Sequence, residues 1–223
     1  QNTNDKLNLK LKSDNSIVTN ADLKSNEILE TQLKKTNIPI ISEENIIDKK
    51  VNTYWIIDPL DGTKDYIKNS KYYSINVALI VKNVPKIGII YSPGLNQLFV
   101  NFLNKEIYSI INNKKSNLLR TKSSKKINML RSRSDDNEVF SLLQKQYDEY
   151  YEEDISSAIK FGFLANDTFN TYLRNIGSSE WDIAAGHAIL EHAGGSITTH
   201  EGKKFLYGKE NYKNLPLIAK RSD

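Results

Sequence analysis

The chain has 223 residues, of which 39% are hydrophobic and 26% are charged, and its formal net charge is +4. These values are typical of a globular protein, and the length allows one large domain or two small ones. Because cysteine is absent, disulfides, thiolate metal sites and a cysteine nucleophile are excluded. No apolar run reaches the roughly 20 residues that cross a bilayer, so we expect no stable membrane insertion. No signal peptide is visible, and we expect a cytoplasmic location.

The first half of the chain reads as a helix followed by a series of strands. An amphipathic pattern predicts the helix at residues 20–35. Short apolar runs bounded by turn residues predict strands at 38–42, 54–57, 72–82, 86–91, 97–101 and 106–110. The basic, polar segment 112–126 reads as a connection, so the predicted halves are residues 1–125 and 126–223.

The second half mixes both kinds of element. Strands are predicted at 127–131 and 196–199, and helices at 138–147, 158–169 and 182–193. The last helix is stopped by Gly194 and Gly195. Since strands are mixed with helices in both halves, the sequence predicts a layered α/β architecture. Three histidines are expected at helix surfaces or in loops, without metal-ligand spacing, namely His187, His192 and His200.

The most informative motif follows the strand at 54–57. Asp58 and Asp61 leave this apolar strand through a turn that contains Pro59 and Gly62. Two carboxylates that converge in this way suit a hard divalent cation such as Mg²⁺, and Gly62 with Thr63 offers free amides to a phosphate. An ordinary surface turn is the simple alternative. An Asp-x-Asp nucleophile motif is disfavoured because the spacing here is one residue longer, which favours attack by a metal-activated water.

Four separated acids stand where a strand ends or a helix begins: Glu43, Asp58, Asp61 and Asp182. Such acids can point into one cleft and share two or more metal ions, an arrangement that suits phosphoryl transfer. Taken alone, Glu43 could be a solvated acid, and Asp182 could simply cap a helix.

Basic residues are concentrated between residues 114 and 133, where no acid occurs. The segment reads either as a solvated linker or as a basic rim that attracts a polyanionic small molecule. A nucleic-acid surface is disfavoured because interleaved aromatic residues are lacking. We therefore expect a small phosphorylated substrate and no nucleic-acid partner; the sequence does not indicate an oligomeric state.

Two segments, 57–63 and 180–186, resemble the two signatures of the inositol monophosphatase superfamily. Segments 14–22, 41–44 and 62–66 are most similar to its 3′(2′),5′-bisphosphate nucleotidase branch. The resemblance implies an αβαβα layered sandwich, here apparently without the first helix. It also implies hydrolysis of the 3′-phosphate of adenosine 3′,5′-bisphosphate, a by-product of sulfate activation, and possible action on its 5′-phosphosulfate analogue.

The resemblance further implies residue roles. Two or three Mg²⁺ ions would be held by Glu43, Asp58, the carbonyl of Leu60, Asp61 and Asp182. Asp22 and Thr63 would orient and deprotonate the attacking water. The amides of Gly62 and Thr63 would bind the scissile phosphate. The nucleotide would be faced by Ser132, Arg133, Ser134, Lys160 and Arg174.

Two internal departures from the family pattern, at Asn166-Asp167 and at Ser178-Ser179, fall near expected substrate contacts. They keep open an inositol or sugar monophosphatase with the same metal chemistry. A non-catalytic metal- or nucleotide-binding relative is disfavoured, because every ligand and water-orienting position holds the required residue type.

Overall fold

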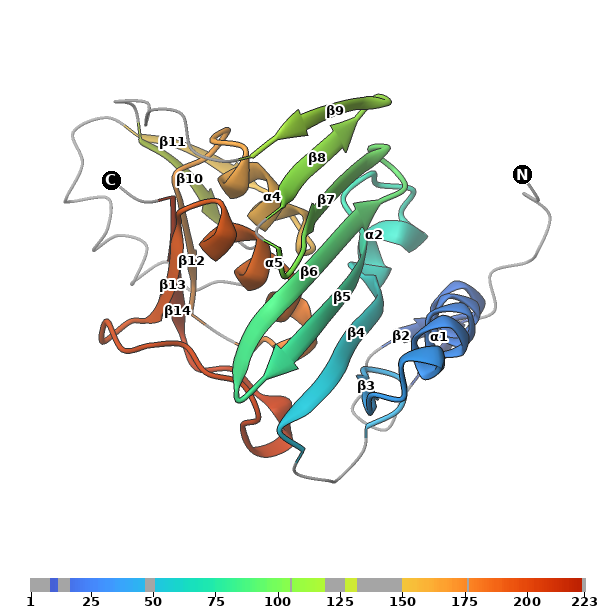
Figure 1. The fold of residues 1–223 in the computed structure, drawn as a ribbon. Coiled ribbons are helices and arrows are strands. Elements are labelled where there is room, and N and C mark those ends of the chain that lie inside the picture. Colours follow the sequence, from blue (N-terminus) through green and yellow to red (C-terminus); the bar gives the residue numbers. More distant parts are fainter. Residues whose placement is uncertain are drawn as a thin grey trace.

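Two β-sheets, one from each half of the chain, face each other across a layer of helices (Figure 1). The structure is a computed structural model, and it describes residues 9–11, 17–46, 51–104, 106–118, 127–131, 150–175 and 177–221. A small antiparallel ribbon of β1 (Leu9–Leu11) and β2 (Ile17–Thr19) precedes α1 (Asn20–Leu33).

The larger sheet has seven strands in the order β3-β4-β5-β6-β7-β8-β9. Its strands are β3 (Ile40–Ser42), β4 (Thr53–Asp61), β5 (Ser74–Val81), β6 (Val84–Ser92), β7 (Gln97–Asn101), β8 (Ile107–Ile111) and β9 (Lys114–Asn117). β3 runs parallel to β4, and every later pair is antiparallel.

The smaller sheet has five strands in the order β11-β10-β12-β14-β13. They are β10 (Ile127–Arg131), β11 (Tyr150–Asp154), β12 (Thr171–Arg174), β13 (Ser196–Thr199) and β14 (Leu217–Lys220). β10 is parallel to both of its neighbours, whereas β14 is antiparallel to β12 and β13.

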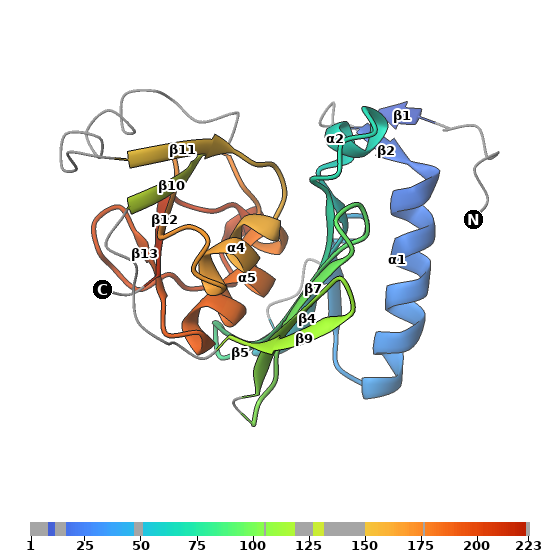
Figure 2. The same ribbon diagram turned by 90° about the horizontal axis from the view of Figure 1, so that it is seen from above.

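Helices form the other layers (Figure 2). α1 covers the outer face of the larger sheet, and α4 (Ile159–Ala165) and α5 (Glu180–His192) lie between the two sheets. This helix–sheet–helix–sheet order confirms the predicted layered α/β class. The helix predicted at 138–147 lies outside the described residues. No helix in the described ranges is long and apolar enough to span a membrane.

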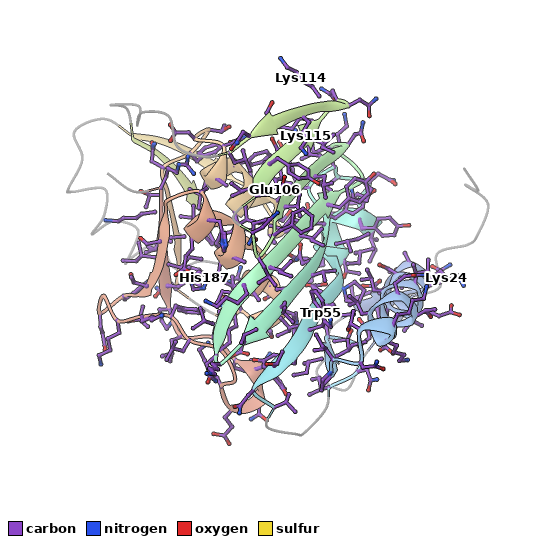
Figure 3. The ribbon with its side chains drawn as sticks, viewed as in Figure 1. Lys24, Trp55, Glu106, Lys114, Lys115 and His187 are labelled. Carbon is purple, nitrogen blue, oxygen red and sulfur yellow. The ribbon has the colours of Figure 1, made fainter. Side chains whose placement is uncertain are left out.

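α1 begins at Thr19 because the sequence provides a capping box there. The helix is followed by a short 3₁₀ turn, η1 (Lys34–Thr36). Trp55 of β4 packs between the sheet and this helical segment, and its indole N–H donates to the Thr36 hydroxyl at 3.0 Å (Figure 3). These contacts attach the outer helix to the sheet.

The main hydrophobic core fills the layer between the sheets and contains residues of both predicted halves, for example Ile56, Phe99, Phe161 and Ile189. α5 approaches β6 closely at Gly88, where a Cβ atom would come within 2.2 Å of the Ala185 carbonyl oxygen. A side chain at this position would separate the helix from the sheet. The division at residue 125 remains a prediction.

Several predicted elements need correction. Segment 112–126 is not simply a connection, because Lys114–Asn117 pairs with β8 as β9. Asn112 and Asn113 both have positive φ, 49° and 64°, as a tight hairpin requires. The sequence also gave no signal for β11, β12 or β14. β4 continues to Asp61 instead of ending at 57.

The prediction for His187 was wrong. Its side chain is 1% exposed and lies in the core side of α5 (Figure 3). Nδ1 is 3.0 Å from the Tyr207 hydroxyl, and Nε2 is 3.1 Å from a carboxylate oxygen of Glu191. The Tyr207 hydroxyl is a hydrogen-bond partner for Nδ1, whereas Nε2 only lies close to the Glu191 carboxylate and has no hydrogen bond within the described residues. These two polar neighbours accompany the burial of the imidazole.

Candidate active site

The last residues of β4 place Asp58 and Asp61. β4 pairs regularly with β5 as far as Asp58 opposite Asn76, and the register then shifts before Asp61. Such an irregularity redirects side chains. The Asp58 side chain is buried, and its Oδ1 accepts the Leu60 N–H at 3.0 Å. The structure thus turns the backbone at the motif that the sequence singled out.

Asp61 is held by both halves of the chain. Its Oδ2 accepts the Asn76 side-chain amide at 3.1 Å and the backbone N–H of Ala158 at 2.5 Å. Asn76 belongs to β5, and Ala158 immediately precedes α4. Asp61 therefore marks the point where the larger sheet meets the second half.

Gly62 makes the turn from β4 into α2 (Thr63–Ile67). Its φ is +89°, a region that favours glycine, and a Cβ there would lie 3.1 Å from the Tyr72 carbonyl oxygen. Figure 1 shows α2 beside the end of β4. The turn fixes the position of Thr63, which is the first residue of the helix.

Asp22 and Thr63 meet although 41 residues separate them. The Thr63 hydroxyl lies 3.1 Å from Asp22 Oδ1 and 3.1 Å from the Leu60 carbonyl oxygen. The other Asp22 oxygen accepts the Thr19 N–H at 2.8 Å and the Thr19 hydroxyl at 2.5 Å. Asp22 is therefore a buried acceptor that both caps α1 and contacts Thr63.

The other two predicted acids reach the same region. Glu43 follows β3 and bonds through its N–H to the Ile57 carbonyl at 3.2 Å. Asp182 lies in the first turn of α5, where its Oδ2 accepts the Ser179 N–H at 2.8 Å. The simple interpretation of Asp182 as a capping residue is thus also true. Both side chains line one cavity together with Asp61.

The acids perturb one another. Burial raises the pKa of Asp58 well above its usual value, and the charges of Glu43, Asp61 and Asp182 raise it further. Burial and then the Asp61 charge raise the pKa of Asp182 to about 7. Burial also raises the pKa of Asp61, although the nearby Lys160 charge opposes that shift. The negative charges of these buried acids are therefore only partly balanced by nearby positive charges.

A divalent cation would relieve this repulsion, and carboxylate oxygens are the ligands that Mg²⁺ prefers. Among the described residues, however, no three histidine or acidic side chains are gathered closely enough to hold a metal ion as they stand. The carboxylate oxygens are therefore suitable ligands for a hard cation. The side chains lie near one another, but they are not arranged as a complete set of metal ligands.

The cavity has a volume of about 480 Å³, and residues of both predicted halves line it. From the second half come Lys160 and Arg174. Lys160 is buried and donates to the Ser157 carbonyl at 2.6 Å, and Arg174 donates to the Gly177 carbonyl at 2.9 Å. Ser132, Arg133 and Ser134 lie outside the described residues.

Residues at the departures from the family pattern lie elsewhere. Ser178 and Ser179 are buried and accept hydrogen bonds from the side chains of Asn214 and Lys213. Asn166 is the C-cap residue of α4. None of the four described departure residues lines the cavity, so these differences do not alter its walls directly.

Sequence reasoning assigned no role in the site to Asn76, Ser157, Lys64 or Lys68. Asn76 contacts Asp61, and a polar residue within the apolar run 75–81 was the available signal. Ser157 has a positive φ of 61°, and its hydroxyl is buried without a hydrogen-bond partner in the described part of the chain. Lys64 and Lys68 also line the cavity, and their spacing of four residues was visible in the sequence.

Comparisons with known proteins agree with the geometry. The chain is 32% identical over 209 residues to the 3′(2′),5′-bisphosphate nucleotidase CysQ of Buchnera aphidicola subsp. Acyrthosiphon pisum, covering 90% of this chain and 78% of that protein. It is 32% identical over 210 residues to CysQ of Salmonella typhimurium, covering 91% and 85%.

Solved structures show the same fold. The crystal structure of CysQ from Bacteroides thetaiotaomicron, described as a bacterial member of the inositol monophosphatase family, aligns with a TM-score of 0.83 and 27% identity. The alignment covers 91% of this chain and 84% of that one. The model of the inositol monophosphatase family matches residues 1–218. This chain therefore belongs to the inositol monophosphatase family.

Proposed function

We propose that this protein is a phosphatase that removes the 3′-phosphate from adenosine 3′,5′-bisphosphate by attack of water. The observation that carries the proposal is the bond between Thr63 and Asp22, at the end of the strand that bears Asp58 and Asp61. The relatives described above are bisphosphate nucleotidases, which supports this substrate.

Members of this family depend on a metal ion, typically Mg²⁺. We infer that two or three Mg²⁺ ions would be held by Glu43, Asp58, the Leu60 carbonyl, Asp61 and Asp182. Bound Mg²⁺ lowers the pKa of water and offsets the negative charge of a reacting phosphate. The mutual repulsion of the acids supports this assignment, because a cation would remove it.

Thr63 and Asp22 would position and deprotonate the attacking water. The Thr63 hydroxyl donates to Asp22, so its own lone pairs are free to accept a proton from water as its hydrogen passes to Asp22. The water oxygen bonds to phosphorus while the bond from phosphorus to the ribose 3′-oxygen breaks. The 3′-oxygen leaves and takes up a proton, giving adenosine 5′-monophosphate and inorganic phosphate.

Other residues would hold the substrate. The amides of Gly62 and Thr63 are proposed to bind the scissile phosphate at the turn into α2. Lys160 and Arg174 line the same cavity and would face the substrate, together with the segment 132–134. Arginine suits this role because its planar guanidinium binds a phosphate with two parallel hydrogen bonds.

The test is a side-by-side comparison with Mg²⁺ of adenosine 3′,5′-bisphosphate, inositol 1-phosphate and fructose 1,6-bisphosphate. We expect a preference for the nucleotide, loss of turnover with EDTA, and a loss of several orders of magnitude in Asp58→Asn. Glu201→Gln, which removes an exposed acid outside the cavity, is the matched control and should keep full activity.

Other results would revise the proposal. A preference for inositol 1-phosphate or for fructose 1,6-bisphosphate would show that the protein is instead an inositol or sugar monophosphatase. Activity in EDTA, or an acyl-phosphate trapped on Asp58 or Asp61, would reject direct attack by a metal-activated water. Absence of turnover on all three substrates would favour a non-catalytic relative.

A further inference from the structure

Glu180 is a buried acid close to the site, and the mechanism proposed above gives it no role. It is the first residue of α5, its side chain is fully buried, and it lies two residues before Asp182. Its carboxylate accepts the backbone N–H groups of Gly208 and Lys209, each at 2.9 Å. The Lys209 ammonium lies 3.2 Å from the same carboxylate. Since a buried charge needs partners, these contacts bind the start of α5 to the segment that contains Gly208 and Lys209.

The segment 208–214, which we call the clamp, contacts the same end of α5 a second time. Its last residue, Asn214, donates through the side-chain amide to the Ser179 carbonyl at 2.6 Å and to the Ser178 hydroxyl at 3.0 Å. The Asn214 N–H donates to the Ser178 carbonyl at 2.9 Å. The Lys209 ammonium also donates to Asn214 Oδ1, at 3.2 Å. The two sets of contacts are therefore joined to each other.

The clamp reaches Asp182 through one peptide unit. Ser179 is the N-cap residue of α5, and its N–H donates to Asp182 Oδ2 at 2.8 Å. The carbonyl of the same peptide unit belongs to Ser178 and accepts the Asn214 N–H. Because a peptide unit is planar and rigid, a contact that fixes its carbonyl also fixes the direction of its N–H. The position of the clamp therefore affects the position of the Asp182 carboxylate, which lines the cavity.

We propose that Glu180 and Asn214 are positioning residues, which fix the clamp to the start of α5 and thereby keep the Asp182 carboxylate at the cavity, where it would bind Mg²⁺. This inference rests on the proposed function, in which Asp182 is a metal ligand, and adds to it the residues that hold this ligand in place. Neither Glu180 nor Asn214 is among the residues that line the cavity, so neither would touch the substrate. Loss of their contacts should consequently weaken Mg²⁺ binding and leave substrate binding unchanged once Mg²⁺ is saturating.

The experiment measures Mg²⁺ binding by calorimetry, without substrate, for the wild-type protein, Glu180→Gln and Asn214→Ala. Glu180→Gln keeps the shape of the side chain, but it removes the charge that faces Lys209 and leaves one oxygen for two backbone N–H groups. Asn214→Ala removes the side-chain hydrogen bonds to Ser178 and Ser179. Residues that orient a metal ligand commonly change metal affinity by about 10- to 100-fold, and we expect the Mg²⁺ dissociation constant to rise by about tenfold in each variant.

Turnover of adenosine 3′,5′-bisphosphate gives a second measurement. The Mg²⁺ concentration for half-maximal turnover should rise by about the same tenfold, whereas KM at saturating Mg²⁺ should stay within about twofold of the wild-type value. A lower melting temperature with unchanged Mg²⁺ affinity would overturn the inference, because Glu180 and Asn214 would then only stabilise the fold. Asn214 is only half-buried, so Asn214→Ala tests the inference even if Glu180→Gln does not fold.

Glu191→Gln is the matched control. Glu191 is another acid of α5, it lies beside the imidazole of His187 near the other end of the helix, and it does not line the cavity. The same chemical change at this position should leave the Mg²⁺ dissociation constant within about twofold of the wild-type value. An equal rise in Glu191→Gln and Glu180→Gln would overturn the inference, since the loss of any negative charge on α5 would then explain the effect.

Binding and turnover in the wild-type protein separate the two levels of the argument. If the protein binds Mg²⁺ but does not hydrolyse the bisphosphate, the proposed function fails, and calorimetry on the variants still decides whether the clamp positions Asp182. If the protein hydrolyses the bisphosphate and both variants bind Mg²⁺ as the wild type does, only the inference on Glu180 and Asn214 fails. If the wild-type protein binds no Mg²⁺, both fail.

Discussion

Asp22 both caps α1 and contacts Thr63. Comparing Asp22→Asn with Thr19→Val separates these two roles better than either substitution alone. Asp22 Oδ2 completes the capping box of α1 with Thr19, and Asp22 Oδ1 contacts Thr63. In Asp22→Asn one of these oxygens becomes an amide nitrogen, which only donates. If the nitrogen faces the Thr19 N–H, two donors oppose each other and the cap is lost. If it faces Thr63, the hydroxyl loses Asp22 as an acceptor and keeps only the Leu60 carbonyl.

The expected magnitudes follow from these contacts. Loss of an N-cap interaction costs about 1 kcal/mol, which lowers the melting temperature of a chain of this size by about 2–4 °C. Loss of a general base lowers kcat by about 10²- to 10⁴-fold. Thr19→Val removes the capping hydroxyl and leaves the bond from Asp22 to Thr63 in place. It should therefore lower the melting temperature by a similar amount and kcat by well under tenfold.

Thermal unfolding and steady-state turnover of the bisphosphate measure both effects. The reasoning is refuted if Asp22→Asn keeps wild-type kcat, because Asp22 would then have no role in proton transfer. It is equally refuted if Thr19→Val and Asp22→Asn lose the same large factor in kcat. In that case the integrity of α1, and not the carboxylate, would control activity.

Two further predictions concern the turn and the acids. Gly62→Ala should lower the free energy of unfolding by about 1–3 kcal/mol and reduce turnover, because alanine is strained at φ +89° and its Cβ approaches the Tyr72 carbonyl; an unchanged melting temperature and kcat would contradict this. For the acids, burial raises the pKa of Asp182 to about 7 in the folded, metal-free protein, whereas in the unfolded chain it is about 3.9. Between these two pH values the unfolded chain has lost the proton and the folded protein has kept it. The free energy of unfolding of the metal-free protein therefore falls as the pH rises through this range. Mg²⁺ needs the ionised acids, and the rise in melting temperature on adding Mg²⁺ should be larger at pH 8 than at pH 5.5; a rise that is larger at pH 5.5 would contradict the assignment.

Local sequence patterns predicted the strands that do not depend on distant parts of the chain. The strands at 97–101, 127–131 and 196–199 were predicted with their observed bounds; the first two are short, largely apolar runs, and the third, with its β-branched residues, follows the helix stop at Gly194 and Gly195. β12 and β14 gave no such signal. Each has only four residues, and β12 is a strand because it lies between β10 and β14. Strand formation there depends on partners that are distant in the sequence.

The candidate site shows the same division. Asp58, Asp61 and Gly62 were recognisable because proline and glycine impose a turn after an apolar strand. The bond from the Ala158 N–H to Asp61 joins residues that are 97 positions apart, and no local pattern indicates it. The burial of His187 likewise depends on Tyr207, which a segment beyond α5 brings against the helix.

The position of α5 between the sheets has a consequence for biosynthesis. During translation, the residues of the larger sheet, which include Asp58 and Asp61, are synthesised long before those of α5, which include Asp182. The core that holds α5 needs residues of both halves, so the fourth acid reaches the others only when that core closes. Nascent chains that are still on the ribosome should consequently carry an incomplete set of acids. Catalytic competence would then appear late and report that folding is complete.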